Sequence, residues 1–358
     1  MQLKKEAKHF DNLLGQDTKI ENIVRSITEE QNVFASLELI NELGILVRRS
    51  NLPKIKEHQE KMVELLYQYL GSKEIDELYQ NLKEVSNIPL KDLLNELYGF
   101  VGLENVKHQV QNLISFNKIQ KLRIDNGLKK SDKTLHLAFL GNPGTGKTSV
   151  ARIIGKMYKS IGCLSKGHFI EVSRTDLIAE YQGQTAIKVK KLINRAKGGV
   201  LFIDEAYSIT ENDHSDSYGR ECLTELTKAL EDYRDDLVVI VAGYTKPMEQ
   251  FFNSNPGLKS RFNNFILFHD YSLNELVDIF KYLCEDNKYD ADEETMERVK
   301  EWLLCKLDQK VENFSNGRLV RNLFDDIITN QAIRLSNQNN ISKEDLKILI
   351  ESDIPQIE

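Results

Sequence analysis

The sequence predicts an α/β protein: a parallel sheet covered by helices, preceded by an all-helical N-terminal domain and followed by a helical C-terminal region. Two observations lead to this fold class. Short apolar runs alternate with helical segments from residue 89 to residue 270, whereas both ends of the 358-residue chain lack a strand pattern. Buried strands that are separated by helices indicate a parallel sheet with helices on both faces.

Composition narrows the class of protein. The chain is 41% hydrophobic and 29% charged, as in a soluble globular protein, and no apolar run approaches the roughly 20 residues of a membrane-spanning helix. Its start shows no secretory signal, and its four cysteines are scattered without a metal-type spacing, so we expect reduced thiols in the cytoplasm. The net charge of −7 gives no broad basic surface, so nucleic acid is not the expected partner, although a local basic patch remains possible.

Residues 1–88 are predicted to form a small helical domain. Apolar residues recur at helical spacing in three stretches between residues 33 and 85, and such stripes usually form a core. Pro89 discourages helix at the residue before it, so we place the joint between this domain and the next at residues 86–90.

Five strands are predicted in the core, residues 89–270. They are residues 135–141, 168–172, 199–205, 237–243 and 265–268. Each is a short apolar run with a helical segment before the next one, as in a parallel sheet. From residue 271 to residue 358 the pattern is helical again, which predicts a small C-terminal bundle.

A phosphate-binding loop is predicted between the first strand and the next helix. Residues 141–148, Gly-Asn-Pro-Gly-Thr-Gly-Lys-Thr, fit the pattern G-x-x-x-x-G-K-[ST]. A loop that wraps its backbone N–H groups around an anion needs glycines, because side chains would block that approach. The helix that follows directs its positive end at the same anion. We expect Lys147 to reach the outer phosphates and the Thr148 hydroxyl to ligate Mg²⁺.

Two carboxylates follow the third predicted strand. Asp204 and Glu205 come directly after the apolar run Val-Leu-Phe-Ile, so a buried strand delivers charge at its C-terminal end. We expect Asp204 to hold Mg²⁺ through water and Glu205 to orient and deprotonate the attacking water. A simple strand-end cap is the alternative, but the phosphate loop earlier in the same sheet favours hydrolysis.

Further polar residues follow at the ends of later elements. Thr245 comes after the fourth strand and is placed to contact the γ-phosphate or the water, unless it is an ordinary turn threonine. Arg261 precedes the fifth strand and is predicted to reach a neighbouring subunit's γ-phosphate; a solvated surface arginine is the alternative. Arg318 and Arg321 are three residues apart, so they share one face of a helix.

Six blocks of sequence resemble the CbxX/CfqX branch of the AAA+ ATPases. They are residues 102–114, 136–153, 164–178, 198–209, 237–262 and 316–322, in the family's order. The resemblance covers residues 90 to 340 and implies that residues 271–358 form the lid of the ATPase. It also implies a ring, usually a hexamer, that holds ATP between its subunits.

The resemblance also assigns roles to individual residues. It places Walker A, which binds the nucleotide, at Asn142, Pro143, Gly144, Thr145, Gly146, Lys147, Thr148 and Ser149. Asp204 and Glu205 become Walker B, and Thr245 becomes the first sensor. Arg261 becomes the arginine finger, which acts on the nucleotide of a neighbouring subunit. Arg318 becomes the second sensor, with Arg321 in reserve. The place where the family packs adenine is matched by Phe100, Val101 and Gly102, unless these form only a packing turn.

One more block of this resemblance bears on mechanism. Tyr181, Gln182 and Gly183 align with the family's central-pore loop, in which an exposed aromatic residue grips an extended peptide. The middle position is usually aliphatic, so Gln182 departs from the pattern and weakens the expected hydrophobic grip. Lys188, Lys190 and Lys191 behind the loop either line the pore or only solvate a helix face.

The leading hypothesis is therefore a homo-oligomeric ATPase that remodels or threads a protein client, with residues 1–88 as a partner-recognition module. A nucleic-acid-associated ATPase of the loader type would use the same loop and Arg261, and steeply salt-dependent stimulation by DNA or RNA would reveal it. A nucleotide-gated scaffold is the third hypothesis, and slow turnover that no partner changes would indicate it.

Overall fold

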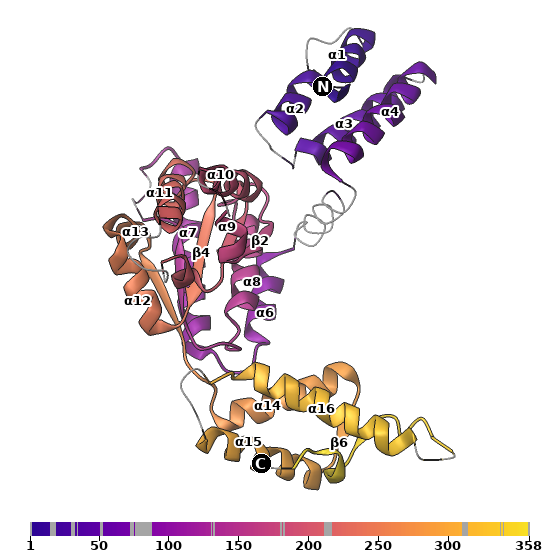
Figure 1. Ribbon diagram of the computed structural model, residues 1–358, viewed down its shortest axis with the longest axis vertical. Helices are drawn as coiled ribbons and strands as arrows, with labels where there is room; N and C mark the ends of the chain where they lie inside the picture. Colours follow the sequence, from indigo (N-terminus) through magenta and orange to yellow (C-terminus); the bar gives the residue numbers. More distant parts are fainter. Residues whose placement is uncertain are drawn as a thin grey trace. The chain divides into compact units, whose positions relative to one another are not determined.

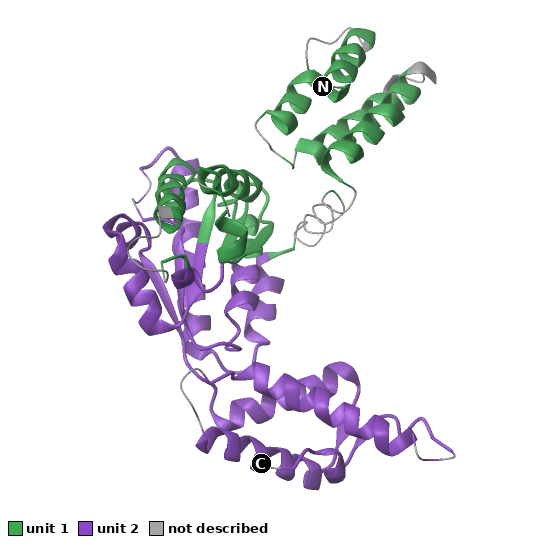
Figure 2. Ribbon diagram, viewed as in Figure 1, with its two compact units in different colours: residues 1–89, 155–202, 209–239 green, residues 90–154, 203–208, 240–358 purple. Residues whose placement is uncertain are grey.

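The fold is described from a computed structural model of the chain, shown in Figure 1. The structure describes residues 2–14, 19–29, 33, 35–50, 53–71, 75, 88–129, 131, 133–179, 181, 183–210, 217–309, 314–336, 338 and 340–356. The chain divides into two compact units (Figure 2). Unit 1 comprises residues 1–89, 155–202 and 209–239, and unit 2 comprises residues 90–154, 203–208 and 240–358.

The N-terminal region of unit 1 is helical, as predicted. Its helices are α1 (Gln2–Leu14), α2 (Lys19–Thr28), α3 (Ala35–Ser50) and α4 (Pro53–Leu70). They share a hydrophobic core of their own, which includes the fully buried Phe10, Leu39 and Leu66. The buried carboxylate of Asp11 accepts hydrogen bonds from the backbone N–H groups of Ile20 and Glu21, so it caps the start of α2.

The central sheet has five strands in the order β2-β3-β4-β1-β5. The strands are β1 (Leu137–Gly141), β2 (Phe169–Val172), β3 (Val200–Ile203), β4 (Val238–Gly243) and β5 (Asn264–Phe268). Strand β1 pairs in parallel with β4 and with β5, and Leu137 lies opposite Ile240 on one side and Asn264 on the other. Every residue of β3 and β4 is buried, as expected for strands that are covered on both faces. The sequence thus placed all five strands correctly.

The helices of the core connect these strands (Figure 1). They are α6 (Leu90–Tyr98), α7 (Glu104–Asp125), α8 (Lys147–Ser160), α9 (Arg174–Leu177), α10 (Thr185–Ala196), the 3₁₀ turn η1 (Ala206–Ile209), α11 (Ser217–Asp232), α12 (Thr245–Ser254) and α13 (Pro256–Arg261). A helix or a 3₁₀ turn begins soon after the end of β1, β2, β3 and β4, which brings helix starts to the C-terminal edge of the sheet.

The C-terminal region of unit 2 is mainly helical, as predicted, and has its own hydrophobic core. Its elements are α14 (Leu273–Asn287), β6 (Asp290–Ala291), α15 (Glu293–Asp308), α16 (Gly317–Ser336), β7 (Ile348–Leu349) and the 3₁₀ turn η2 (Glu351–Asp353). Ser272 and Glu275 form a capping box at the start of α14, and Asp292 caps α15. The parallel pair β6–β7 is an addition that sequence analysis did not predict, because strands of two residues are too short to show an alternating pattern.

Among the residues that the structure describes, no helix combines the length and apolar character needed to cross a membrane.

Candidate nucleotide-binding site

A cavity of about 660 Å³ lies in unit 2 and is large enough for a nucleotide. Its walls come from residues 96–103, which we call the lead-in to the core, and from the phosphate loop, the end of β3, the end of β4 and the lid. The lining residues are Glu96, Gly99, Phe100, Val101, Leu103, Gly141, Pro143, Gly144, Gly146, Lys147, Thr148, Ser149, Asp204, Glu205, Gly243, Tyr244, Tyr271, Ile279, Tyr282, Leu283, Gly317, Arg318 and Arg321.

The phosphate loop has the backbone that its glycines predict. Gly144 adopts a left-handed φ of 71°, and a Cβ atom there would lie 2.1 Å from the carbonyl oxygen of Ser315. Only glycine fits this position, because a side chain would be both strained and in collision with the lid. Helix α8 begins at Lys147, so its first N–H groups are directed into the cavity side of the loop.

Lys147 lies within the loop that it is expected to serve. Its ammonium group donates hydrogen bonds to the carbonyl oxygens of Asn142 at 2.7 Å and Gly141 at 3.0 Å. Burial lowers the pKa of Lys147 to about 8, and the nearby carboxylates of Asp204 and Glu205 partly oppose that shift. The side chain is thus a buried cation whose charged form a bound anion would stabilise further.

The two carboxylates follow β3, as predicted, and both line the cavity. The backbone N–H of Glu205 donates to Asp204 Oδ1 at 3.0 Å. Glu205 has a left-handed φ of 47°, a conformation that costs a glutamate energy and that occurs often at functional sites. This turn separates the two side chains: Asp204 is half-buried and Glu205 is exposed. The two carboxylates therefore differ in their exposure to solvent.

The lid closes the other side of the cavity. Arg318 and Arg321, in the first turns of α16, both line it, so neither position is favoured over the other by placement alone. Tyr271, Ile279, Tyr282 and Leu283 add an apolar wall. Sequence analysis missed this wall, because an apolar stripe on α14 is indistinguishable from an ordinary helix core in the sequence.

Of the three residues predicted to pack against adenine, two line the cavity and one does not. Phe100 and Val101 line the cavity, together with Leu103, which the sequence did not single out. Gly102 does not line it. Its left-handed φ is 59°, and a Cβ atom there would lie 2.1 Å from Glu275 Oε1 in the lid, so this glycine permits the close approach of the lead-in to the lid.

Other predicted residues lie outside the lining of this cavity. Asn142 and Thr145 belong to the phosphate loop but do not line the cavity. They bond to each other within the loop, since Thr145 Oγ1 donates to the carbonyl oxygen of Asn142 at 2.8 Å. Thr245 is the first residue of α12, and its neighbours Gly243 and Tyr244 line the cavity instead. Arg261 ends α13, where its Nη1 donates to the carbonyl oxygen of Gly257 at 3.0 Å.

The predicted pore residues lie in unit 1. Tyr181 is 67% exposed, and Gly183 has a left-handed φ of 79° with open space where a Cβ atom would be. Gln182 lies outside the described residues. Behind this loop, Lys188 donates to the carbonyl oxygens of Thr175 and Ile178, and Lys190 pairs with Glu225 at 3.4 Å.

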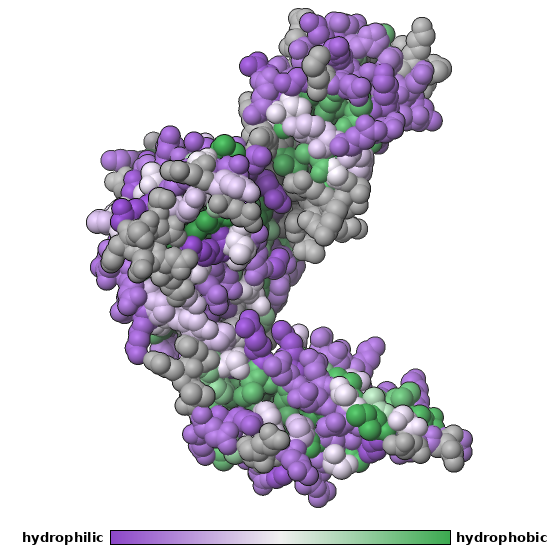
Figure 3. Space-filling view, viewed as in Figure 1, coloured by the Kyte–Doolittle hydropathy of each residue, from purple (hydrophilic) through white to green (hydrophobic). Residues whose placement is uncertain are grey.

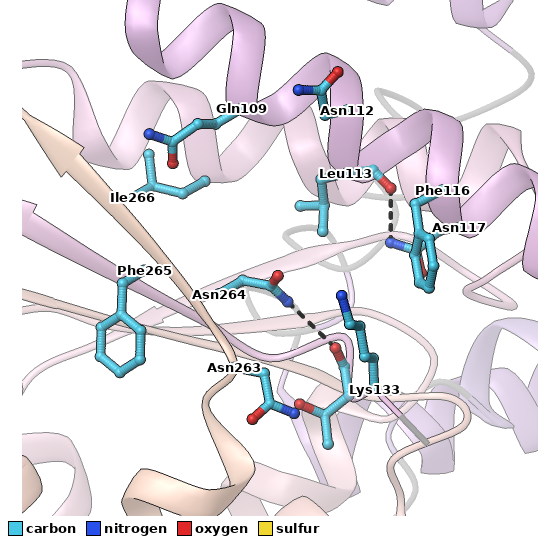
Figure 4. A pocket seen from close by; sticks show the side chains of 11 residues that line it. Gln109, Asn112, Leu113, Phe116, Asn117, Lys133, Asn263, Asn264, Phe265 and Ile266 are labelled. Atoms are coloured by element: carbon cyan, nitrogen blue, oxygen red, sulfur yellow. Dashed lines mark hydrogen bonds between the residues drawn. The ribbon is translucent and has the colours of Figure 1, made fainter. Parts of the chain in front are cut away.

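A second cavity of about 380 Å³ lies between α7 and β5 (Figure 4). Five of its eleven lining side chains are carboxamides, and among them Asn117 donates to the carbonyl oxygen of Leu113 and Asn264 to that of Thr134. Among the described residues, the lining contains one cation, Lys133, and no carboxylate. It therefore lacks the acid–base groups that the larger cavity has, and the larger cavity is the candidate site for hydrolysis.

Family models and relatives show which known proteins this chain is similar to. Residues 137–270 match the model of the ATPase family associated with various cellular activities (AAA), and residues 272–358 match the AAA lid domain. The chain is 40% identical to stage V sporulation protein K of Bacillus subtilis over 266 residues, which cover 74% of this chain and 82% of that protein. The chain belongs to the CbxX/CfqX branch of the AAA+ ATPases.

Other members of this AAA+ branch are similar to the same extent. Ribulose bisphosphate carboxylase/oxygenase activase of Cyanidioschyzon merolae is 39% identical, over 75% of this chain and 89% of that protein. Protein CbbX of Cereibacter sphaeroides is 39% identical, over 74% and 86%. In fold, the chain resembles the FIGL-1 AAA domain, with a TM-score of 0.52, 20% identity and coverage of 72% of this chain and 80% of that one. As an AAA+ protein, the chain is an ATP hydrolase.

Proposed function

We propose that this AAA+ ATPase works as a ring of identical subunits that hold ATP and Mg²⁺ between them and use hydrolysis to remodel or thread a protein client. The proposal rests on one observation: the predicted site residues do not all line the same cavity. One cavity in unit 2 gathers the phosphate loop, both carboxylates and the lid arginines, whereas Arg261 does not line it. A transition state that builds negative charge needs such an arginine, and a neighbouring subunit is the proposed recipient.

The residues of the cavity suit a metal-bound nucleotide. Among the described residues, no three His, Cys, Asp or Glu side chains gather to hold a metal by themselves. The Thr148 hydroxyl and the Asp204 carboxylate both line the cavity and are oxygen donors, which Mg²⁺ prefers when phosphates complete its shell. When bound there, Mg²⁺ would neutralise charge on the phosphate oxygens.

Each remaining step is assigned to a residue of the chain. We assign to Glu205 the removal of a proton from the attacking water, to Lys147 and the loop N–H groups the binding of the outer phosphates, and to Arg318 the contact from the lid. Thr245 is proposed to hold the water or the γ-phosphate. Adenine is proposed to pack near Phe100 and Val101. The FIGL-1 AAA domain has also been solved in complex with ADP, which supports an adenine nucleotide as the ligand.

The proposed client contact is the loop at Tyr181. An aromatic ring that is 67% exposed beside the unhindered Gly183 can grip a passing peptide without reading its sequence. The hydrogen bonds from Lys188 to Thr175 and Ile178 anchor the start of α10 to the segment before the loop. Residues 1–88 have a core of their own, and we propose them as the module that selects the client. A relative named as an activase of ribulose bisphosphate carboxylase/oxygenase supports a protein as the client.

The surface of the lid supports assembly into a ring. Large apolar residues of the lid that are exposed to between 42% and 59% include Ile333, Ile341, Leu346 and Ile348. Figure 3 shows hydrophobic surface on the lid. Exposed apolar groups of this kind are typically covered in an assembly. We propose a neighbouring subunit as the cover.

A mixing experiment tests the shared site. Arg261→Ala and Glu205→Gln are each expected to lower ATP turnover at least a hundredfold, because each removes one half of the site. In a random mixture, about a quarter of the interfaces combine an intact Glu205 with an intact neighbouring Arg261, so turnover should recover toward a quarter of the wild-type rate. No recovery on mixing, or full activity of a strictly monomeric Arg261→Ala variant, would overturn the proposal.

A further inference from the structure

Asn316 joins the lid to the core through a buried carboxamide. The residue is fully buried and adopts a left-handed φ of 48°, a region that asparagine tolerates better than most residues. Its Oδ1 accepts a hydrogen bond from the backbone N–H of Tyr271 at 2.9 Å. Its Nδ2 donates to Asp270 Oδ1 at 2.8 Å and to the carbonyl oxygen of Phe314 at 2.9 Å.

The same oxygen of Asp270 also binds the phosphate loop. Asn142 Nδ2 donates to Asp270 Oδ1 at 2.9 Å. This single carboxylate oxygen therefore receives two hydrogen bonds, one from the phosphate loop and one from Asn316, just before α16. A hydrogen bond to a charged acceptor is stronger than one between neutral groups. We call the set Asn142, Asp270 and Asn316 the carboxamide latch.

Backbone contacts reinforce the carboxamide latch at the next residues. The N–H of Gly317 donates to the carbonyl oxygen of Gly144 at 3.1 Å, and Tyr271 Oη donates to that of Thr145 at 3.4 Å. Arg318 follows Gly317 directly and lines the cavity. These bonds connect the phosphate loop directly to the backbone that carries Arg318.

We propose that the carboxamide latch transmits the conformation of the phosphate loop to the lid and thereby positions Arg318 on the nucleotide. Asn316 is a positioning residue in this account, because it acts through Asp270 and the start of α16. The inference rests on the proposed nucleotide site. An asparagine is required because a carboxylate in its place would be unable to donate to Asp270 or to the carbonyl of Phe314.

The test measures whether Arg318 depends on the carboxamide latch. Asn316→Gly removes the carboxamide and keeps the left-handed backbone. Asn330→Ala is the matched control, since it removes a carboxamide that bonds only within the lid, to the carbonyl of Asp353 at 2.8 Å. We expect Asn316→Gly to lower kcat about tenfold and to raise the KM for ATP about three- to tenfold, because Arg318 loses its place on the nucleotide while the loop N–H groups still bind phosphate. The control should leave both unchanged.

A double-mutant cycle gives the sharper readout. Arg318→Ala should weaken ATP binding about tenfold in the wild-type chain but less than threefold in the Asn316→Gly chain, where Arg318 is no longer positioned. Equal losses in both backgrounds, or an Asn316→Gly variant that behaves like Asn330→Ala, would overturn the latch. If the wild-type chain binds no ATP, the proposed nucleotide site fails instead.

A second set of substitutions, at Asn142 and Asp270, tests the carboxamide latch if Asn316→Gly does not fold. Asn142→Asp places two carboxylates against each other and should lower kcat about tenfold. Adding Asp270→Asn removes the repulsion between the two carboxylates but restores only one of the two bonds, because Asn142 and Asn316 both donate to Asp270 Oδ1, so we expect part of the lost kcat to return. If the second substitution lowers activity further, the carboxamide latch is excluded.

Discussion

The ammonium group of Lys147 lies 2.7 Å from the carbonyl oxygen of Asn142, so the cation expected to bind phosphate is held by its own loop. Both residues belong to the turn that the glycines make possible, and burial there lowers the pKa of Lys147 to about 8. A bound triphosphate would compete with the loop carbonyls for the same protons and would favour the charged lysine. Binding of nucleotide and binding of a proton are therefore linked.

This linkage predicts the pH dependence of binding. Below pH 8 Lys147 is already charged, whereas above pH 8 each binding event must also take up a proton, so affinity for ATP should fall up to tenfold per pH unit between pH 8 and 9.5. Calorimetry at pH 8.5 in buffers of different ionisation enthalpy should show proton uptake. Affinity that stays constant over this range would contradict the lowered pKa.

Glu205→Gln should separate binding from hydrolysis. The amide keeps the shape of the side chain but is a poor base, so we expect ATP affinity within about threefold of wild type and turnover reduced by a hundredfold or more. Equilibrium binding and steady-state phosphate release measure the two quantities. Glu231→Gln, an exposed carboxylate paired with Arg234, is the control and should change neither. Undiminished hydrolysis by Glu205→Gln would remove this residue from the mechanism.

Tyr181→Ala should uncouple the ATPase from its client. The ring is exposed and lies outside the nucleotide cavity, so basal turnover should stay within about twofold, while stimulation by a client and remodelling of that client are lost. Tyr233→Ala removes another exposed ring, which lies after α11 and outside residues 1–88, and serves as the control. A trap built on Glu205→Gln can first capture the client with ATP for mass spectrometry. Remodelling that survives Tyr181→Ala would exclude the threading contact.

Gly144→Ala should damage both binding and stability. The added Cβ atom would meet the carbonyl oxygen of Ser315 at 2.1 Å and the left-handed φ adds strain, so we expect destabilisation of about 1–3 kcal/mol and loss of ATP binding. Gly127→Ala is a matched control, because Gly127 has nearly the same φ of 73° in open space. Thermal unfolding should show a smaller loss for Gly127→Ala, with ATP binding intact. Equal effects of the two substitutions would show that crowding against the lid is unimportant.

The sequence by itself determined the local features of this AAA+ ATPase. The five strands lie where apolar runs predicted them, and the loop of residues 141–148 has left-handed glycines followed at once by α8. Backbone conformation at such positions depends on neighbours in the sequence, so pattern alone is sufficient. Glu205 was also assigned from its place after a buried strand, and it lines the cavity with Asp204.

Only the tertiary structure decided which distant residues meet. The apolar wall formed by Tyr271, Ile279, Tyr282 and Leu283 and the bonds of Asp270 with Asn142 and Asn316 join segments that are up to 174 residues apart in the chain. Nothing in the composition of a helix or a turn reveals which partner it will contact, because that choice depends on packing in three dimensions. The stretch 316–322 was predicted to matter for its arginines, yet the fold assigns its asparagine the role of joining the lid to the phosphate loop.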